Sequence, residues 1–260
     1  CHHNRYLLGR CCNHHSCKRS HHCCRETRLK VKQAMFIGHF APAFAARAIT
    51  GDAPKLGTLF IAAQLVDWIF FLLVLGEIEH MRPAPGITAI SPIDFYDYPY
   101  THSLAGTAII GVIFGLIVAV TMRNSVAAVW GSLVVCSHWV LDWVSHRSDL
   151  TLAGGEMTFG LGLWNFPLAA MVLEVAFLGL AFWWYLARTR GPVVPPLILL
   201  GALLALQAAN WFGPQPTDLS IPFIAPALLA FAVLTALAYW VGKTRWHRAE
   251  VGLGVASPPP

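Results

Sequence analysis

Charged residues are scarce in this sequence. Only 12% of the 260 residues are Asp, Glu, Lys or Arg, and the mean hydropathy is +0.57, whereas an average soluble domain carries about twice that share of charge. The chain also lacks the alternating apolar and polar stretches that are typical of an outer-membrane barrel. These absences argue against a soluble domain and predict an all-α protein, a polytopic transmembrane helical bundle.

The chain after residue 34, which we call the body, contains a single cysteine, Cys136. A disulfide framework within the body is therefore excluded. The other six cysteines lie in residues 1–34, among Cys-Cys and His-His pairs whose spacing does not match a zinc finger. This segment has no hydrophobic period, and Met35 is the first methionine. We therefore expect residues 1–34 to be a disordered basic tail, or sequence upstream of the native start, rather than a zinc-binding tail.

The positive charge of the chain is confined to the same tail. Residues 1–34 carry eight basic residues and one acidic residue, a formal charge of +7, whereas the remainder carries ten basic and twelve acidic residues, a charge of −2. A body with this balance is not expected to bind nucleic acid. We expect residues 35–248 to form a single transmembrane domain and the proline-rich residues 249–260 to form a disordered C-terminal tail.

Six apolar stretches approach the length of about 20 residues that a helix needs to cross a bilayer. They cover residues 55–76, 103–122, 125–146, 167–186, 193–211 and 221–241. A shorter apolar stretch, residues 36–49, predicts a partial or tilted helix before them. Two polar loops, residues 77–101 and 147–165, join some of the spans, and three prolines in the first loop argue against a regular element there.

Most basic residues of the body lie in or beside the short connections. If every span crosses the membrane, these residues all fall on one side: Lys55, Arg123, Arg188, Arg190, Lys243, Arg245 and Arg248. Cytoplasmic loops are enriched in Lys and Arg. We therefore expect a multi-pass protein of a bacterial inner membrane, with a cytoplasmic C-terminus and both long loops outside.

Several ionisable residues lie inside or beside the predicted spans, where they are costly unless they are paired or functional. His138, Asp142 and His146 recur every four residues and therefore share one helix face. The expected topology brings ionisable residues from other segments to a similar depth, in the outer half of the membrane. The candidate metal ligands are therefore three imidazoles and two carboxylates, those of His39, Asp67, His102, His138 and Asp142. This set favours Zn²⁺, with Mn²⁺ or Fe²⁺ as alternatives, over Ca²⁺.

Three further residues stand close to this set in the expected topology. His146, Asp149 and Glu174 are candidates for general acid–base catalysis or for orienting the metal ligands. Each ionisable residue also has a structural interpretation: a hydrogen-bonded core histidine, a helix cap, a membrane-boundary residue or a structural pair. The sequence leaves both interpretations open for any single residue.

Four motifs follow one another in the first half of the chain. They are Gly-His at 38–39, an intramembrane Asp at 67, Tyr-Thr-His-Ser at 100–103 and His-Trp-Val-Leu-Asp at 138–142. Their order resembles the LexA-binding, inner-membrane-associated hydrolase family, also described as membrane-bound metal-dependent hydrolases. The resemblance covers about residues 35–149 and implies metal ligands at His39, Asp67, His102, His138 and Asp142. The family tends to show two acids where this chain has Asp67 alone, which argues against a two-metal site.

Three functions are compatible with the sequence. The first, which we favour, is a metal-dependent hydrolase acting on a lipid, phosphoester or similar amphipathic substrate at the outer face. The second is a transporter or channel with a proton or cation path through Asp67, His138 and Glu174, although no inverted repeat supports it. The third is a non-catalytic membrane scaffold in which the polar residues hold the bundle together.

Overall fold

Each predicted span is a single α-helix in the computed structural model, which describes residues 37–213 and 219–249. The six long helices are α2 (Leu56–Leu75), α3 (Leu104–Met122), α4 (Ser125–Ser145), α5 (Pro167–Arg188), α6 (Val194–Phe212) and α7 (Ile221–Thr244). All six are long and apolar enough to cross a membrane, which confirms the predicted all-α bundle. The predictions for residues 1–34 and 250–260 lie outside the described residues.

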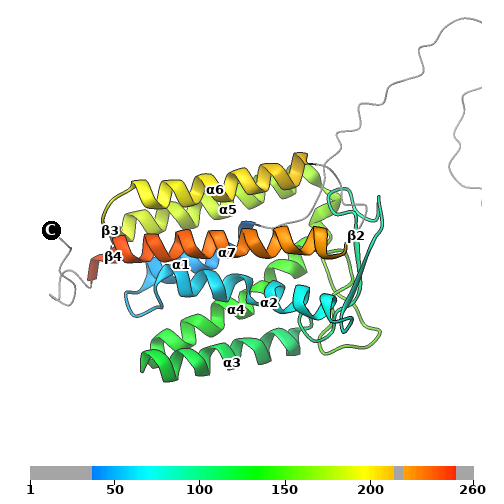
Figure 1. The fold of residues 1–260 in the computed structure, drawn as a ribbon, viewed down its shortest axis with the longest axis horizontal. Coiled ribbons are helices and arrows are strands. Elements are labelled where there is room, and N and C mark those ends of the chain that lie inside the picture. Colours follow the sequence, from blue (N-terminus) through cyan, green and yellow to red (C-terminus); the bar gives the residue numbers. More distant parts are fainter. Residues whose placement is uncertain (1–36, 214–218, 250–260) are drawn as a thin grey trace, which may run out of the picture. The chain divides into compact units, whose positions relative to one another are not determined.

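The short apolar stretch before these spans forms the 3-10 turn η1 (Ile37–Phe40) and the helix α1 (Ala41–Ile49). The helix α1 packs against α2 and α5 (Figure 1). Its Phe44 is fully buried and meets the rings of Phe60 and Phe182 edge-on. The partial helix that the sequence predicts therefore lies inside the bundle, and it brings η1 and His39 into the core.

The helices α3 and α4 form a close antiparallel pair joined by the two residues Arg123 and Asn124. The side chain of Asn124 caps α4 by accepting a hydrogen bond from the backbone N–H of Ala127. Glycine allows the close approach: a Cβ added at Gly115 would lie 2.0 Å from Oγ of Ser132. This packing fixes the position of α4, which carries the His138–Asp142 stripe.

The loop of residues 77–101 contains regular structure, against which its prolines had argued. Strand β1 (His80–Pro83) pairs antiparallel with β2 (Ile93–Asp97). The prediction was wrong because the prolines mark the ends of the strands: Pro83 is the last residue of β1, and Pro92 directly precedes β2. Salt bridges also join the strands, between Arg82 and Asp94 at 2.7 Å and between His80 and Asp97 at 2.9 Å.

A second two-stranded sheet closes the opposite end of the bundle, where β3 (Thr189–Arg190) pairs with β4 (Trp246–His247) (Figure 1). The buried side chain of Arg245 holds this end together. Its guanidinium donates hydrogen bonds to the backbone carbonyls of Gly191 at 2.6 Å and Pro192 at 2.8 Å. Arg245 therefore ties the end of α7 to the turn between α5 and α6.

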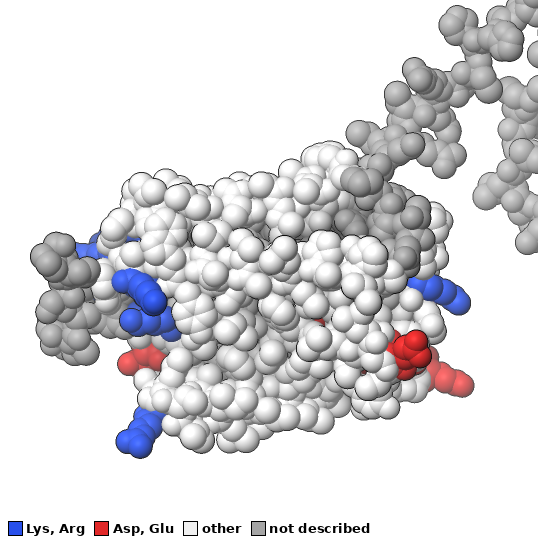
Figure 2. All heavy atoms as spheres, in the orientation of Figure 1, with Lys and Arg blue, Asp and Glu red and all other residues white. Residues whose placement is uncertain are grey.

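Charged side chains lie mainly at the two ends of the bundle, and most basic ones share one end (Figure 2). Between the ends the visible surface is almost entirely uncharged. Large apolar side chains are exposed in the middle of the helices, for example Leu116 of α3 and Leu180 of α5. A surface of this kind is stable against lipid rather than water. The described part of the chain is therefore a multi-pass membrane protein.

Candidate metal centre

The centre begins with the polar stripe of α4. His138 and Asp142 lie one turn apart on this helix, and both side chains are buried. Nε2 of His138 is 3.3 Å from Oδ2 of Asp142. Spacing of four residues places the two side chains on one face of the helix, as the sequence predicts.

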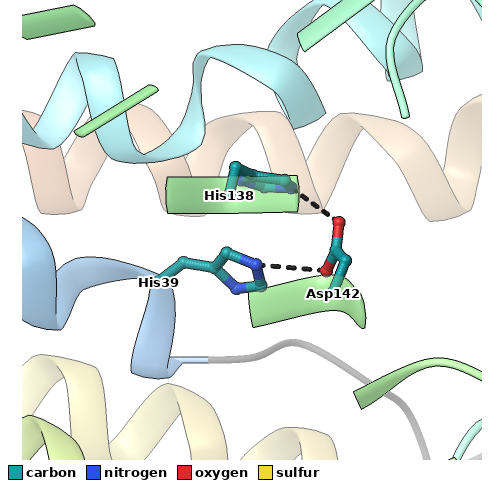
Figure 3. Close-up of side chains that lie close together, drawn as sticks. All are labelled: His39, His138 and Asp142. Carbon is teal, nitrogen blue, oxygen red and sulfur yellow. Dashed lines mark ion pairs between the residues drawn. The ribbon is translucent and has the colours of Figure 1, made fainter. Parts of the chain in front are cut away.

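The turn η1 adds His39 to this pair. Nε2 of His39 lies 3.1 Å from Oδ1 of Asp142. Its ring lies beside that of His138, with centroids 4.1 Å apart. Figure 3 shows the two imidazoles reaching the two oxygens of the same carboxylate. The side chains of His39, His138 and Asp142 therefore form one group that could hold a metal ion.

Asp67 in the middle of α2 and His102 just before α3 complete the cluster. Oδ1 of Asp67 is 3.4 Å from Nε2 of His102 and 3.5 Å from Nε2 of His138. Nε2 of His102 is also 3.7 Å from Oδ2 of Asp142. These three residues, Asp67, His102 and His138, form a second group that could hold a metal ion. All five side chains that the sequence selects as metal ligands are thus neighbours in space.

Four of these ligand atoms form a ring in which nitrogen and oxygen alternate. The order is Nε2 of His138, Oδ2 of Asp142, Nε2 of His102 and Oδ1 of Asp67, with sides of 3.3–3.7 Å. Around a tetrahedral zinc ion with bonds of roughly 2.0–2.1 Å, neighbouring ligand atoms are roughly 3.3–3.4 Å apart. The four sides of the ring are therefore close to, or slightly longer than, the separation of two ligands on one zinc ion.

The hydrogen bonds of the two histidines leave their Nε2 atoms available as ligands. Nδ1 of His138 lies 3.1 Å from the carbonyl oxygen of Ala63, which can only accept, so Nδ1 carries the proton. Nδ1 of His102 lies 2.8 Å from Oγ1 of Thr101. Fixing one ring nitrogen of a histidine by a hydrogen bond is how proteins orient imidazole ligands toward a metal.

The donor set fits a single ion. The two groups that could hold a metal share His138. Because Nδ1 of His138 is engaged, both groups depend on the one lone pair of its Nε2, which binds one ion. Oδ2 of Asp142 is buried and accepts no hydrogen bond from the described residues. A buried carboxylate oxygen without a hydrogen bond is costly, and a cation would satisfy it.

No protein-family model, curated protein or solved structure matches this chain. The assignment of the centre therefore rests on its geometry and its donor atoms.

The five clustered side chains differ in their exposure. Side-chain exposure is 25% for Asp67, against 1–6% for His39, His102, His138 and Asp142. A buried apolar cluster of Phe70, Tyr98 and Leu150 lies between α2 and the loops. Asp67, at mid-height of α2, is therefore the most exposed of the five side chains.

His146 stands beside the centre as the C-terminal cap of α4. Its Nε2 lies 3.7 Å from Oδ1 of Asp142, and its Nδ1 lies 3.1 Å from Oδ1 of Asp149. Burial alone would lower the pKa of His146, but the nearby carboxylates, Asp142 and then Asp149, outweigh burial and raise it. The structure thus places His146 next to one predicted ligand, with Asp149 fixing its far nitrogen.

Glu174, the other residue predicted to act in acid–base chemistry, is bound elsewhere. Its buried carboxylate accepts a hydrogen bond of 2.7 Å from Nε2 of Gln207 on α6. Among the interactions of the described residues, none joins Glu174 to the five clustered side chains. The structure therefore does not bring Glu174 into the centre as it does His146.

Glu79 is a feature of the site that the sequence did not reveal. It is fully buried beneath the loop before α3, where its Oε1 accepts hydrogen bonds from the backbone N–H groups of Tyr100 and Thr101. Its Oε2 accepts a hydrogen bond of 2.6 Å from the hydroxyl of Thr101. In the sequence Glu79 resembles the other acids of a polar loop, and nothing in its local pattern separates it from them.

Proposed function

We propose that this chain is a membrane-embedded hydrolase that uses one divalent metal ion, with Zn²⁺ the best fit. The ligands are drawn from His39, Asp67, His102, His138 and Asp142. The observation that carries the proposal is the alternating ring of imidazole nitrogens and carboxylate oxygens, with sides of 3.3–3.7 Å. Mixed nitrogen and oxygen donors suit Zn²⁺, and Mn²⁺ and Fe²⁺ accept the same donors.

The residues around the ring have distinct parts in this proposal. A divalent ion held by these residues would supply Lewis-acid chemistry, polarising the bond to be hydrolysed and making water a stronger nucleophile. Asp67 and Asp142 supply negative charge to hold the ion, and His102 and His138 present their Nε2 lone pairs. His146 is the best-placed proton carrier, because Asp149 holds its Nδ1 at 3.1 Å and its Nε2 faces the centre. Glu174 is the weaker candidate, since Gln207 engages its carboxylate.

The proposed substrate is amphipathic, for example a lipid or a phosphoester with an apolar chain. Asp67, the most exposed ligand, lies halfway along an apolar membrane helix. Its neighbours Trp68 and Phe71 are aromatic and pack against Phe231 of α7. A molecule dissolved in the bilayer can therefore bring a polar group to Asp67 while its apolar part stays in an apolar environment.

The resemblance to the LexA-binding, inner-membrane-associated hydrolase family supports the same proposal through motif order. We place the protein in a bacterial inner membrane with its C-terminus in the cytoplasm, because the short connections carry the basic residues. In this orientation the centre belongs to the outer half of the membrane.

The two alternatives explain fewer of these contacts. A proton or cation path through Asp67, His138 and Glu174 would need Glu174 to continue the ring, but its carboxylate is bonded to Gln207. A scaffold that uses the polar residues only for packing would be expected to satisfy its buried groups, yet Oδ2 of Asp142 accepts no hydrogen bond from the described residues. Both observations favour the metal centre.

Hydrolysis by purified protein tests the proposal. The full chain in mixed micelles is stripped with a chelator, reloaded with Zn²⁺, and incubated with long-chain p-nitrophenyl phosphodiesters and carboxylic esters. We expect hydrolysis that Zn²⁺ restores, that is lost in Asp142→Ala, and that persists in His80→Ala, a change at a half-exposed loop histidine. Hydrolysis that is indifferent to the chelator, or absent from protein with bound zinc, would reject the catalytic role.

A further inference from the structure

Glu79, Thr101 and His102 form a continuous chain of hydrogen bonds that ends at the proposed centre. The carboxylate of Glu79 contacts the Thr101 hydroxyl at 2.6 Å, and the same hydroxyl oxygen lies 2.8 Å from Nδ1 of His102. The opposite nitrogen of that ring, Nε2, faces Asp67 and Asp142 at 3.4 and 3.7 Å. All three side chains of the chain are buried.

The direction of these hydrogen bonds follows from the donors available. A carboxylate has no hydrogen to donate, so the single hydroxyl hydrogen of Thr101 points to Glu79. Oγ1 of Thr101 can then only accept from His102, which places the ring proton on Nδ1. The other ring nitrogen, Nε2, is left with a free lone pair that faces the two carboxylates.

We propose that Glu79 is a positioning residue that, through Thr101, holds His102 in the tautomer whose Nε2 can bind the metal ion. This inference rests on the proposed metal centre for its function, but the tautomer itself is a property of the chain without metal. Among the described residues, Glu79 makes hydrogen bonds to Tyr100 and Thr101 and to none of the five proposed ligands. Its effect on the centre is carried by the orientation of one hydroxyl group.

The substitution Glu79→Gln keeps the shape of the side chain but is expected to place the ring proton of His102 on the opposite nitrogen. Oε1 of Glu79 accepts from two backbone N–H groups, those of Tyr100 and Thr101, so the amide oxygen of a glutamine must take that place. The amide NH₂ then faces Thr101 and donates to its hydroxyl oxygen. The hydroxyl hydrogen turns to Nδ1 of His102, and the ring proton moves to Nε2, which can no longer bind a metal ion.

The matched control is Asp97→Asn in the same loop. It also replaces a carboxylate by the isosteric amide, but Asp97 is half-exposed and pairs with His80 rather than with the centre. Thr101 provides an independent pair of variants. Thr101→Ser keeps the hydroxyl, whereas Thr101→Val keeps the shape and removes the hydroxyl.

The experiment measures the tautomer and the zinc affinity separately on the full chain. Nitrogen-15 NMR of histidine-labelled protein without metal, with the His102 signals assigned by loss in His102→Gln, reports which ring nitrogen is protonated. We expect Nδ1–H in the wild type and in Asp97→Asn, and Nε2–H in Glu79→Gln. We also expect zinc affinity to fall about 10–100-fold in Glu79→Gln and Thr101→Val but not in Thr101→Ser.

The outcomes separate this inference from the proposed function. An Nδ1–H signal in Glu79→Gln, or equal zinc affinity in Thr101→Val and Thr101→Ser, would overturn the positioning role even if the wild type binds zinc. A wild type that binds no zinc would reject the metal centre, while the tautomer measurement would still decide the role of Glu79. If Glu79→Gln does not fold, the two Thr101 variants decide it.

Discussion

Nε2 of His138 lies 3.3 Å from Oδ2 of Asp142, one helical turn further along α4, and that oxygen accepts no hydrogen bond from the described residues. The other ring nitrogen of His138 is bonded to the carbonyl of Ala63 on α2. A bound cation could satisfy such a buried carboxylate oxygen. Four predictions follow from this arrangement and from the contacts around it.

Binding of zinc should stabilise the folded protein. The proposed ligands come from α2, α4, η1 and the segment before α3, so a bound ion would link elements that are far apart in the sequence. At a free zinc concentration 100 times Kd, linkage adds about 2.7 kcal/mol. We expect the Tm of wild-type protein in detergent to rise with zinc, and the Tm of His138→Ala to stay constant. An equal rise in both proteins would place the zinc elsewhere, for example on the Cys- and His-rich residues 1–34.

Gly106 should be essential for the position of His102. A Cβ at this site would lie 2.1 Å from the carbonyl oxygen of Tyr100, which is backbone and cannot rotate away. Gly106→Ala should therefore shift the segment that carries Thr101 and His102, cost about 1–3 kcal/mol in stability and lower zinc affinity. Thermal unfolding and zinc titration measure the two effects.

Gly179→Ala is the control for that prediction, because a Cβ there meets no atom within 4 Å. It should leave zinc affinity unchanged and raise stability slightly, since alanine is favoured over glycine in a helix by roughly 0.5–1 kcal/mol. If Gly106→Ala also leaves the zinc affinity unchanged, zinc binding does not depend on the position of the segment before α3.

Tyr98 should make stability fall at alkaline pH. Burial, followed by the neighbouring Asp149 carboxylate, raises the pKa of Tyr98 well above its usual value of 10.0. The folded state therefore keeps a proton that the unfolded chain releases, so the free energy of unfolding decreases as pH rises above about 10. Tyr98→Phe has no such proton, and its Tm should decline less steeply between about pH 9 and 11. Parallel curves for the two proteins would contradict this.

Glu174 should be dispensable for metal binding. Its carboxylate is bonded to Gln207 at 2.7 Å, and no interaction of the described residues joins it to the ring. We expect Glu174→Gln to bind zinc with the affinity of the wild type and to retain hydrolysis. A liposome flux assay provides the second measurement: proton or cation flux that disappears in both Glu174→Gln and Asp67→Asn would favour the transport alternative instead.

The helices and the cluster of His39, Asp67, His102, His138 and Asp142 could be predicted because a membrane limits what a sequence can do within it. Apolar stretches of about 20 residues have few alternatives to a membrane span, and α2 to α7 begin and end within three residues of the predicted bounds. Asp67, His138 and Asp142 stand out because ionisable groups are rare inside such spans. His39 and His102 could be added because the alternation of the spans placed them at the same depth.

The loops could not be predicted in this way. The hairpin of β1 and β2 depends on side-chain pairs such as Arg82 with Asp94, which become visible only once the chain has folded. The same is true of Glu79, whose hydrogen bonds reach 21 and 22 residues along the chain to Tyr100 and Thr101. In these loops nothing in the local sequence distinguishes a buried acid such as Glu79 from a solvated one.

The metal content of the purified protein shows whether the clustered histidines and aspartates bind an ion. The full chain in detergent is exposed to equimolar zinc, washed, and analysed for bound metal and for the atoms around it by X-ray absorption, in the wild type, His138→Ala and His80→Ala. We expect one zinc ion with nitrogen and oxygen ligands in the wild type and in His80→Ala, and loss of that ion in His138→Ala. Zinc bound only through sulfur, or equally in all three proteins, would contradict it.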